Sequence, residues 1–148
     1  MALTRPNPVT LVVVEDTDED FDTVVEAVER TGLHPVVRRA TTGEAGLAVI
    51  RELPTDGSVL VLMDLNTPGT DGREALAELK ADPALKSIPV IVFSTSASST
   101  DIDVCYAAGA NAYHVKPVEY PEHLQLVIDV VGYWCGRVEL AGADGGRS

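Results

Sequence analysis

The sequence is poor in basic side chains: its 148 residues contain 11 Lys and Arg against 23 Asp and Glu, and the formal net charge is −12 at pH 7. Nucleic acids and anionic membranes attract proteins through a basic face. We therefore expect neither DNA nor a membrane surface as a partner. The sequence also lacks an apolar run approaching the roughly 20 residues of a membrane-spanning helix. Residues 1–10 lack the apolar segment of a secretory signal, so we expect a cytoplasmic protein.

Cysteine and aromatic residues are scarce as well. Cys105 and Cys135 have no metal-ligand spacing, and we expect them to be reduced thiols in the core. Aromatic residues make up 5% of the chain and hydrophobic residues 45%, so a core must consist mainly of Val, Leu, Ile and Ala. The length fits one domain. We place it at residues 8–140 and expect a disordered Gly-rich tail at 141–148.

Short apolar runs alternate with helical patterns along the chain. The runs typical of strands lie at residues 9–16, 34–40, 59–65, 88–94 and 112–117. Each is followed by apolar residues at helical spacing, as in Phe21, Val24, Val25 and Val28. Five strands, each followed by a helix, predict parallel pairing with helices on both faces. The expected fold class is thus α/β, a doubly wound five-stranded parallel sheet.

Several residues are expected to mark the helix ends. Gly32 and Gly109 are predicted to stop the first and fourth helices, because glycine readily adopts the left-handed conformation. Thr41 or Thr42 is the expected cap of the second helix, and Asp71 that of the third. The run at 34–40 is more polar than the others, which predicts a strand near an edge of the sheet.

Polar side chains stand where four of the five predicted strands end. They are Glu15 and Asp16, Asp64, Ser94 and Thr95, and Lys116 and Pro117. The carboxyl ends of parallel strands share one edge of the sheet, where sites form at the switch in strand order. Clustered carboxylates repel each other, and a hard cation such as Mg²⁺ relieves the repulsion.

These groups suit phosphoryl transfer, in which positioning and charge neutralisation dominate catalysis. Asp64 is a plausible nucleophile, since carboxylates can form acyl phosphates. Lys116 offers a compact positive charge, and Ser94 offers a hydroxyl donor. By contrast, we interpret Asp18, Glu19, Asp20 and Asp22 as acids favoured by a helix N-terminus.

Four motifs in the region Leu11–Trp134 resemble the receiver domain of two-component response regulators, a flavodoxin-like sandwich. They are the acid pair in "VVVED", the segment "LMDLNTPGTDG", the hydroxyl in "PVIVFST" and the "KP" of "AYHVKP". Within the family, "GYWCGRVEL" and the long segment around Asp64 look most like the stand-alone regulators associated with bacterial phytochromes.

The resemblance implies a role for each matching residue. Asp64 would be the phosphoacceptor, and Mg²⁺ would be held by Glu15, Asp16, Asp64 and the backbone carbonyl of Asn66. Lys116 would bind the carboxylate and then the phosphoryl group, aimed by a cis bond to Pro117. Ser94 and Tyr113 would form the switch, with Tyr113 turning inward when Ser94 moves. The protein would thus be a signalling switch rather than an enzyme.

The expected partners are a sensor histidine kinase, such as a bacteriophytochrome, and a second copy of the chain. Tyr133, Trp134, Val138 and Leu140 extend an apolar stripe to the end of the last helix, which favours a homodimer through this region. The alternative is that this segment folds back on its own domain.

Two other functions would use a similar set of residues. A pseudo-receiver adaptor would have the fold without phosphorylation, although Asp64, Lys116 and the acid pair are all present. A haloacid-dehalogenase-type phosphatase would carry its nucleophile on the first strand and a second Asp two positions later. Here Asn66 occupies that later position relative to Asp64.

Overall fold

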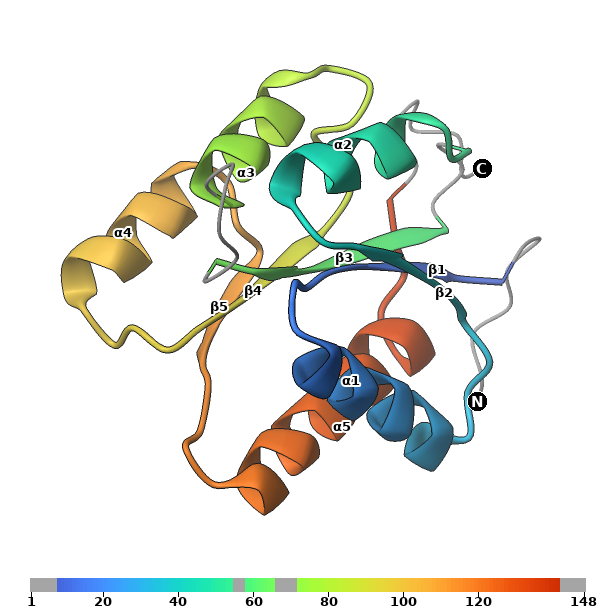
Figure 1. Ribbon diagram of the computed structural model, residues 1–148. Coiled ribbons are helices and arrows are strands. Elements are labelled where there is room, and N and C mark those ends of the chain that lie inside the picture. The colour runs from blue at the N-terminus through green and yellow to red at the C-terminus, as the bar shows by residue number, and fades with distance from the viewer. Residues whose placement is uncertain (1–7, 55–57, 66–71, 142–148) are drawn as a thin grey trace.

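The computed structural model describes residues 8–54, 58–65 and 72–141 (Figure 1). Asn66, Asp71 and the tail residues 142–148, about which predictions were made above, lie outside these ranges.

Strands and helices alternate through the described chain. They are β1 (Thr10–Val14), α1 (Asp18–Thr31), β2 (Val36–Ala40), α2 (Gly43–Arg51), β3 (Val59–Asp64), α3 (Gly72–Ala81), β4 (Val90–Ser94), α4 (Ser99–Ala107), β5 (Ala112–Val115) and α5 (Tyr120–Gly136). The predicted order of elements is therefore confirmed. Every strand is shorter than its predicted run: β1 and β5 end before the polar residues Glu15 and Lys116, β3 ends one residue earlier than predicted, and β2 and β4 begin two residues later than predicted. None of the described helices has the length and apolar character needed to cross a membrane.

The five strands form one parallel sheet in the order β2-β1-β3-β4-β5. β1 therefore lies between β2 and β3, and the strand order reverses beside it. Sites in such sheets form at this reversal, beyond the carboxyl ends of the strands. All residues of β3 and β4 are buried, whereas β2 alternates between exposed and partly buried side chains until Ala40, as expected for an edge strand.

Helices cover both faces of the sheet. α1 and α5 pack side by side on one face, and α2, α3 and α4 lie on the other (Figure 1). Each layer has its own apolar core, built largely from Val, Leu and Ile. Cys135 is buried in the first core and Cys105 in the second, which confirms the prediction of core thiols.

The expected helix ends are largely present. Gly32 follows α1 with a left-handed φ of 72°, which a residue with a side chain adopts only at a cost. Thr42, rather than Thr41, caps α2, because its hydroxyl accepts a hydrogen bond from the amide of Ala45 at 3.0 Å. Gly109 has a φ of 109°, and a Cβ there would stand 2.7 Å from Cγ of Lys80.

The C-terminal segment corrects one expectation. The predicted apolar stripe is not exposed: Leu140 is fully buried, and Trp134 and Val138 pack against the core under α1 and α5. Only Tyr133 of the four residues is exposed, at 59%. The chain after α5 folds back on its own domain because the apolar layer extends beyond the last helical turn.

Candidate phosphoacceptor and cation site

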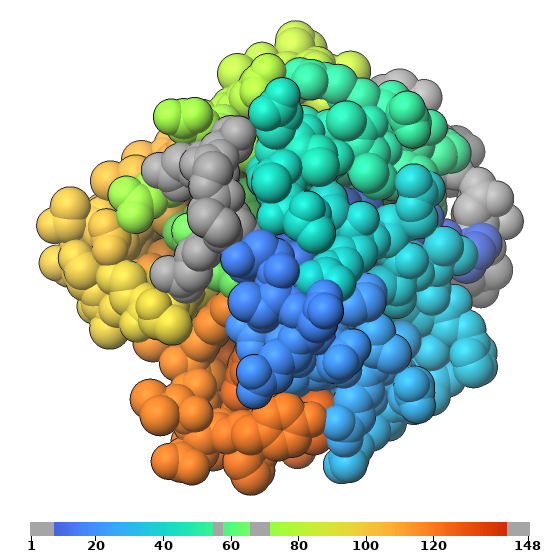
Figure 2. Space-filling view, viewed as in Figure 1, coloured from blue at the N-terminus to red at the C-terminus, as the bar shows by residue number. Residues whose placement is uncertain are grey.

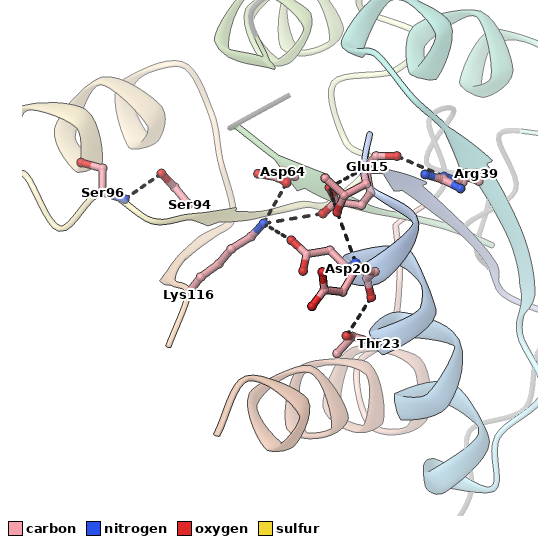
Figure 3. A network of polar contacts seen from close by, with 10 residues as sticks. Glu15, Asp20, Thr23, Arg39, Asp64, Ser94, Ser96 and Lys116 are labelled. Carbon is pink, nitrogen blue, oxygen red and sulfur yellow. Dashed lines mark hydrogen bonds and ion pairs between the residues drawn. The ribbon is translucent and has the colours of Figure 1, made fainter. Parts of the chain in front are cut away.

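The predicted site residues from β1, β3 and β5 meet at the carboxyl edge of the sheet (Figure 3). Asp64 is the last residue of β3, Glu15 follows β1, and Lys116 follows β5. The backbone sets their positions: the amide of Glu15 bonds to the carbonyl of Ala40, and the amide of Lys116 bonds to the carbonyl of Ser94. Because β4 lies between β3 and β5, Lys116 must extend across one strand to reach Asp64.

The Lys116 ammonium group lies among three carboxylates. Its Nζ is 2.8 Å from Oδ2 of Asp64, 3.0 Å from Oδ2 of Asp20 and 3.6 Å from Oε1 of Glu15. The side chains of Lys116, Asp64 and Glu15 are less than one-tenth exposed, whereas that of Asp20 is 32% exposed. Burial favours the neutral lysine, but the hydrogen bond and charge of Asp64, then the charge of Glu15, raise the pKa of Lys116.

Glu15 has the most perturbed carboxyl group of the site. Burial, followed by a hydrogen bond and charge repulsion from Asp64, raises the pKa of Glu15 from 4.5 to about 8. Arg39 of β2 does not compensate this carboxylate directly. Its Nε donates to the Glu15 backbone carbonyl at 3.1 Å, and its Nη1 donates to Asp18 at 2.7 Å. Arg39 therefore stabilises the β1–α1 connection and does not offset the negative charge of the three carboxylates.

The carboxylates are arranged as a hard cation requires. One oxygen each of Glu15, Asp20 and Asp64 lies within 4.8 Å of the others. Oxygen donors at this separation suit Mg²⁺ or Mn²⁺, which bind carboxylates and retain waters. The repulsion that raises the Glu15 pKa is what a bound cation would relieve. The donor set therefore fits a divalent metal.

Asp20 belongs to this group of carboxylates, contrary to its interpretation as an acid favoured only by the helix N-terminus. It does lie in the first turn of α1, but it also contacts Lys116. A signal was available, because a helix that starts directly after β1 presents its first turn to the edge of the sheet. The predicted ligand Asp16 is partly exposed and is not in this group, and Asn66 lies outside the described residues.

Ser94 and Tyr113 lie on neighbouring strands and both contact Ser96. The Ser94 hydroxyl accepts a hydrogen bond from the amide of Ser96 at 3.1 Å (Figure 3). The Tyr113 hydroxyl donates to the carbonyl of Ser96 at 2.8 Å, and its ring packs against the core on the α3 and α4 side. Tyr113 is thus already turned inward, while the Ser94 hydroxyl faces the loop after β4.

The expected cis bond before Pro117 is wrong for this structure, in which the described peptide bonds are all trans. The two isomers of an X–Pro bond differ little in free energy, by about 0.5–1 kcal/mol. Lys116 reaches Asp64 with the trans isomer. Pro117 also lines an open groove beside Lys116, together with Glu19, Thr23, Val118, Tyr120 and His123.

Comparison with known proteins agrees with the fold and with the motifs. The family described as "Response regulator receiver domain" matches residues 11–128. The response regulator Rcp1 of Synechocystis sp. (strain ATCC 27184 / PCC 6803 / Kazusa) is 31% identical over 140 residues, which are 92% of this chain and 95% of Rcp1. The protein named "Probable methanogenesis regulatory protein FilR2" of Methanothrix harundinacea (strain 6Ac) is 31% identical over 90% of this chain and 88% of its own.

Solved structures show the same similarity. The Mn²⁺-bound form of Rcp1 superimposes with a TM-score of 0.82 at 30% identity, covering 91% of this chain and 100% of the other. The phosphorylated cyanobacterial phytochrome response regulator RcpA gives a TM-score of 0.81 at 33% identity, covering 90% and 99%. The chain therefore belongs to the response regulator receiver domain family.

Proposed function

We propose that this protein is a signalling switch whose Asp64 accepts a phosphoryl group from the phosphohistidine of a sensor histidine kinase. The observation that carries the proposal is the buried Asp64 carboxylate, which lies 2.8 Å from the Lys116 ammonium group and close to two further carboxylates. The open groove beside Lys116 gives the kinase histidine a route to this edge of the sheet.

Glu15, Asp20 and Asp64 fit a divalent cation, and we propose Mg²⁺ as the physiological one. Asp16 and the carbonyl of Asn66 remain further proposed ligands. When bound, Mg²⁺ would neutralise negative charge on the transferred phosphoryl oxygens. The Mn²⁺-bound form of the similar Rcp1 supports a divalent metal in this type of domain.

In the transfer, one oxygen of Asp64 forms a bond to phosphorus as the phosphorus–nitrogen bond of the phosphohistidine breaks. The electron pair of that bond stays on the imidazole nitrogen, which then takes up a proton. Lys116 is in place to stabilise the transferred charge, because its ammonium group already contacts Asp64 and can redirect its hydrogen bonds from the carboxylates to phosphoryl oxygens. Hydrolysis of the acyl phosphate later returns Asp64 and inorganic phosphate.

The phosphoryl group would then change the surface formed by α4, β5 and α5. We propose that the Ser94 hydroxyl leaves the amide of Ser96 and donates to a phosphoryl oxygen, which displaces the loop after β4. Tyr113 contacts that loop through the Ser96 carbonyl, so its ring would respond to the displacement.

The variant Asp64→Asn tests the phosphoacceptor. We expect it to lose all labelling by radioactive acetyl phosphate in the presence of Mg²⁺, because the amide cannot act as the nucleophile. Asp103→Asn, which removes an exposed carboxylate of α4, is the matched control and should label like the wild type. Labelling of Asp64→Asn at the wild-type level would refute the assignment. A wild type that never labels would favour the pseudo-receiver, and sustained turnover of a phosphate monoester would favour the phosphatase.

We further infer that the kinase is a bacteriophytochrome. The similarity to Rcp1 and to the phytochrome response regulator RcpA supports this pathway. FilR2 and Rcp1 are both 31% identical to this chain, so the pathway has to be tested by comparing kinases directly. An autophosphorylated bacteriophytochrome kinase should label Asp64 within seconds to minutes, and a histidine kinase without a phytochrome module should do so far more slowly. Equal rates would contradict the inference.

We also propose a homodimer, formed through α4, β5 and the start of α5 rather than through the end of the chain. Among the described residues, most exposed large hydrophobic side chains occur from α4 onward, including Val104, Tyr106, Val115 and Val118. Val118 is 98% exposed. Such apolar surface is typical of an interface.

Sedimentation of the double variant Val115→Asp and Val118→Asp tests the dimer. We expect the wild type to sediment as a dimer and the variant as a monomer, because each subunit would bury two new charges in the interface. Val36→Asp, on the opposite edge strand, is the control and should leave the mass unchanged. A monomeric wild type would refute the proposal. Truncation before residue 140 would be less informative, since it removes Leu140 from the core.

A further inference from the structure

Ser96 lies at a junction of three elements. Its amide donates to the Ser94 hydroxyl at the end of β4, and its carbonyl accepts from the Tyr113 hydroxyl of β5. Its own hydroxyl donates to Oδ2 of Asp101 in α4 at 2.6 Å. The same hydroxyl accepts from the amide of Ser98, the cap of α4. The position of Ser96 therefore sets where the acceptor of the Tyr113 hydroxyl lies.

Asp101 is the residue that secures this junction to the helices. It lies in the first turn of α4, where its amide contacts the Ser98 hydroxyl at 3.5 Å. One carboxylate oxygen accepts the short bond from Ser96, and the other lies 3.7 Å from Nη2 of Arg73 in the first turn of α3. Asp101 thus bridges α4 and α3, and these helices follow the strands that end in Ser94 and Asp64.

The inward ring of Tyr113 does not depend on Ser94 reaching Asp64. In this structure Ser94 bonds to the loop, yet Tyr113 is inward and bonded to Ser96. The Ser96 carbonyl is the acceptor for the Tyr113 hydroxyl among the described residues. A charged acceptor such as Asp101 forms a stronger hydrogen bond than a neutral one, so it restrains the loop that carries this carbonyl.

We propose that Asp101 is a positioning residue that, through Ser96, holds Tyr113 inward in the unphosphorylated protein. The α4–β5 surface is therefore partly set before any phosphoryl transfer, and Ser94 modifies an arrangement that Asp101 maintains. The consequence for partner binding rests on the proposed function, but the position of Tyr113 does not.

The test follows Tyr113 in protein labelled with 3-fluorotyrosine, without metal or phosphoryl donor. The chain has four tyrosines, and Tyr113→Phe identifies the fluorine resonance of Tyr113. In Asp101→Ala we expect this resonance to move toward that of the exposed Tyr133, because the loop that carries the Ser96 carbonyl is no longer restrained by Asp101. Ser96→Ala should give a similar shift, and the double variant should shift the resonance no further, since both substitutions remove the Ser96–Asp101 hydrogen bond.

Two controls separate positioning from general stability. Asp103→Ala removes an exposed carboxylate from the same helix and should leave the Tyr113 resonance in place. Asp101→Asn keeps a side-chain oxygen for the Ser96 hydroxyl but loses the charge, so its resonance should lie between those of the wild type and Asp101→Ala. Ser96→Ala leaves the first-turn charge of α4 intact, so it carries the test if Asp101→Ala does not fold.

The inference is overturned if Ser96→Ala and Asp101→Ala both keep the wild-type resonance. It is also overturned if Asp103→Ala shifts the signal equally, or if Ser94→Ala shifts it while Ser96→Ala does not. All of these readouts use unphosphorylated protein, so a failure of phosphoryl transfer would refute the proposed function and leave this inference standing.

Discussion

Among single side chains, the balance of charge around Lys116 governs the chemistry. One ammonium group faces the carboxylates of Asp64, Asp20 and Glu15, so the site as a whole has an excess of negative charge if all three carboxyl groups ionise. A proton on Glu15 or a divalent cation can offset that excess. Without metal, the raised pKa of Glu15 indicates that the proton fills this role at neutral pH.

Metal affinity should therefore depend on pH through Glu15. A carboxylate binds metal in its ionised form, so below its pKa of about 8 metal binding must release the proton. We expect the apparent Mg²⁺ affinity to rise by up to about tenfold per pH unit from pH 6 toward pH 8 and then to level off. Calorimetric titration at pH 6, 7 and 9 measures this, and buffers of different ionisation enthalpy report the released proton.

Glu15→Gln provides the comparison for that titration. Gln cannot ionise, so its affinity should be lower above pH 8 but nearly independent of pH between 6 and 8. An equally steep pH dependence in Glu15→Gln would show that another group binds the proton.

At the level of the secondary-structure elements, a second titratable group, His114, lies where β5 pairs with β4. The His114 ring stacks on that of Phe93 across the two strands, with centroids 5.2 Å apart. Its Nδ1 is buried and has no hydrogen-bond partner in the part of the chain that the structure describes. Burial lowers the pKa of His114, against a smaller opposing effect of the Val92 carbonyl.

The lowered pKa of His114 makes the folded protein less stable at acidic pH. The unfolded chain takes up a proton on His114 near pH 6.5, whereas the folded protein resists it until a lower pH. The unfolded state then binds more protons, so stability falls as the pH drops below about 6.5. Urea unfolding between pH 7.5 and 5 should show a decline that is smaller in His114→Phe, which keeps the stacked ring but cannot titrate.

The difference in unfolding free energy between the wild type and His114→Phe reports the titration of His114 separately from that of the other groups. Glu15, with its raised pKa, acts in the opposite direction, since its contribution is lost as the pH rises toward 8. The contribution of Glu15 is the same in the wild type and in His114→Phe, so it cancels when their unfolding free energies are subtracted. A difference that stays constant from pH 7.5 to 5 would contradict the assignment to His114.

For the whole molecule, the end of the chain contributes to the core under α1 and α5. Leu140 is fully buried in that core although it follows the last helix. We expect Leu140→Ala to lower the free energy of unfolding by about 2–5 kcal/mol, as buried leucines do when a cavity remains. Urea denaturation measures the change.

Val36→Ala is the control for that measurement. Val36 is 47% exposed on the edge strand opposite the proposed interface, so its truncation should change stability by less than about 1 kcal/mol. A loss in Leu140→Ala no larger than in Val36→Ala would place the segment outside the core.

The space-filling view shows which helices surround α1 at the surface. The surface of α1 lies between those of α2 and α5 (Figure 2). The first turn of α1 supplies Asp20, and the connection before α5 borders the groove beside Lys116. A partner that approaches this groove therefore meets residues from both ends of the domain.

The sequence by itself determined the order of the elements, the parallel sheet and the gathering of Glu15, Asp64 and Lys116. These follow from local patterns, because an apolar run specifies a buried strand and parallel strands deliver their carboxyl ends to one edge. Chain spacing and residue type were sufficient for that part of the site.

Only the tertiary structure decided the placement of Asp20, Tyr113 and Leu140. Asp20 reaches Lys116 because α1 is held over the sheet edge by its packing on α5 and by the contact of Arg39 with Asp18. Tyr113 is inward because a loop from another strand supplies its acceptor, and Leu140 is buried because the core extends past α5. Each depends on residues far apart in the chain, and a local pattern carries no information about such contacts.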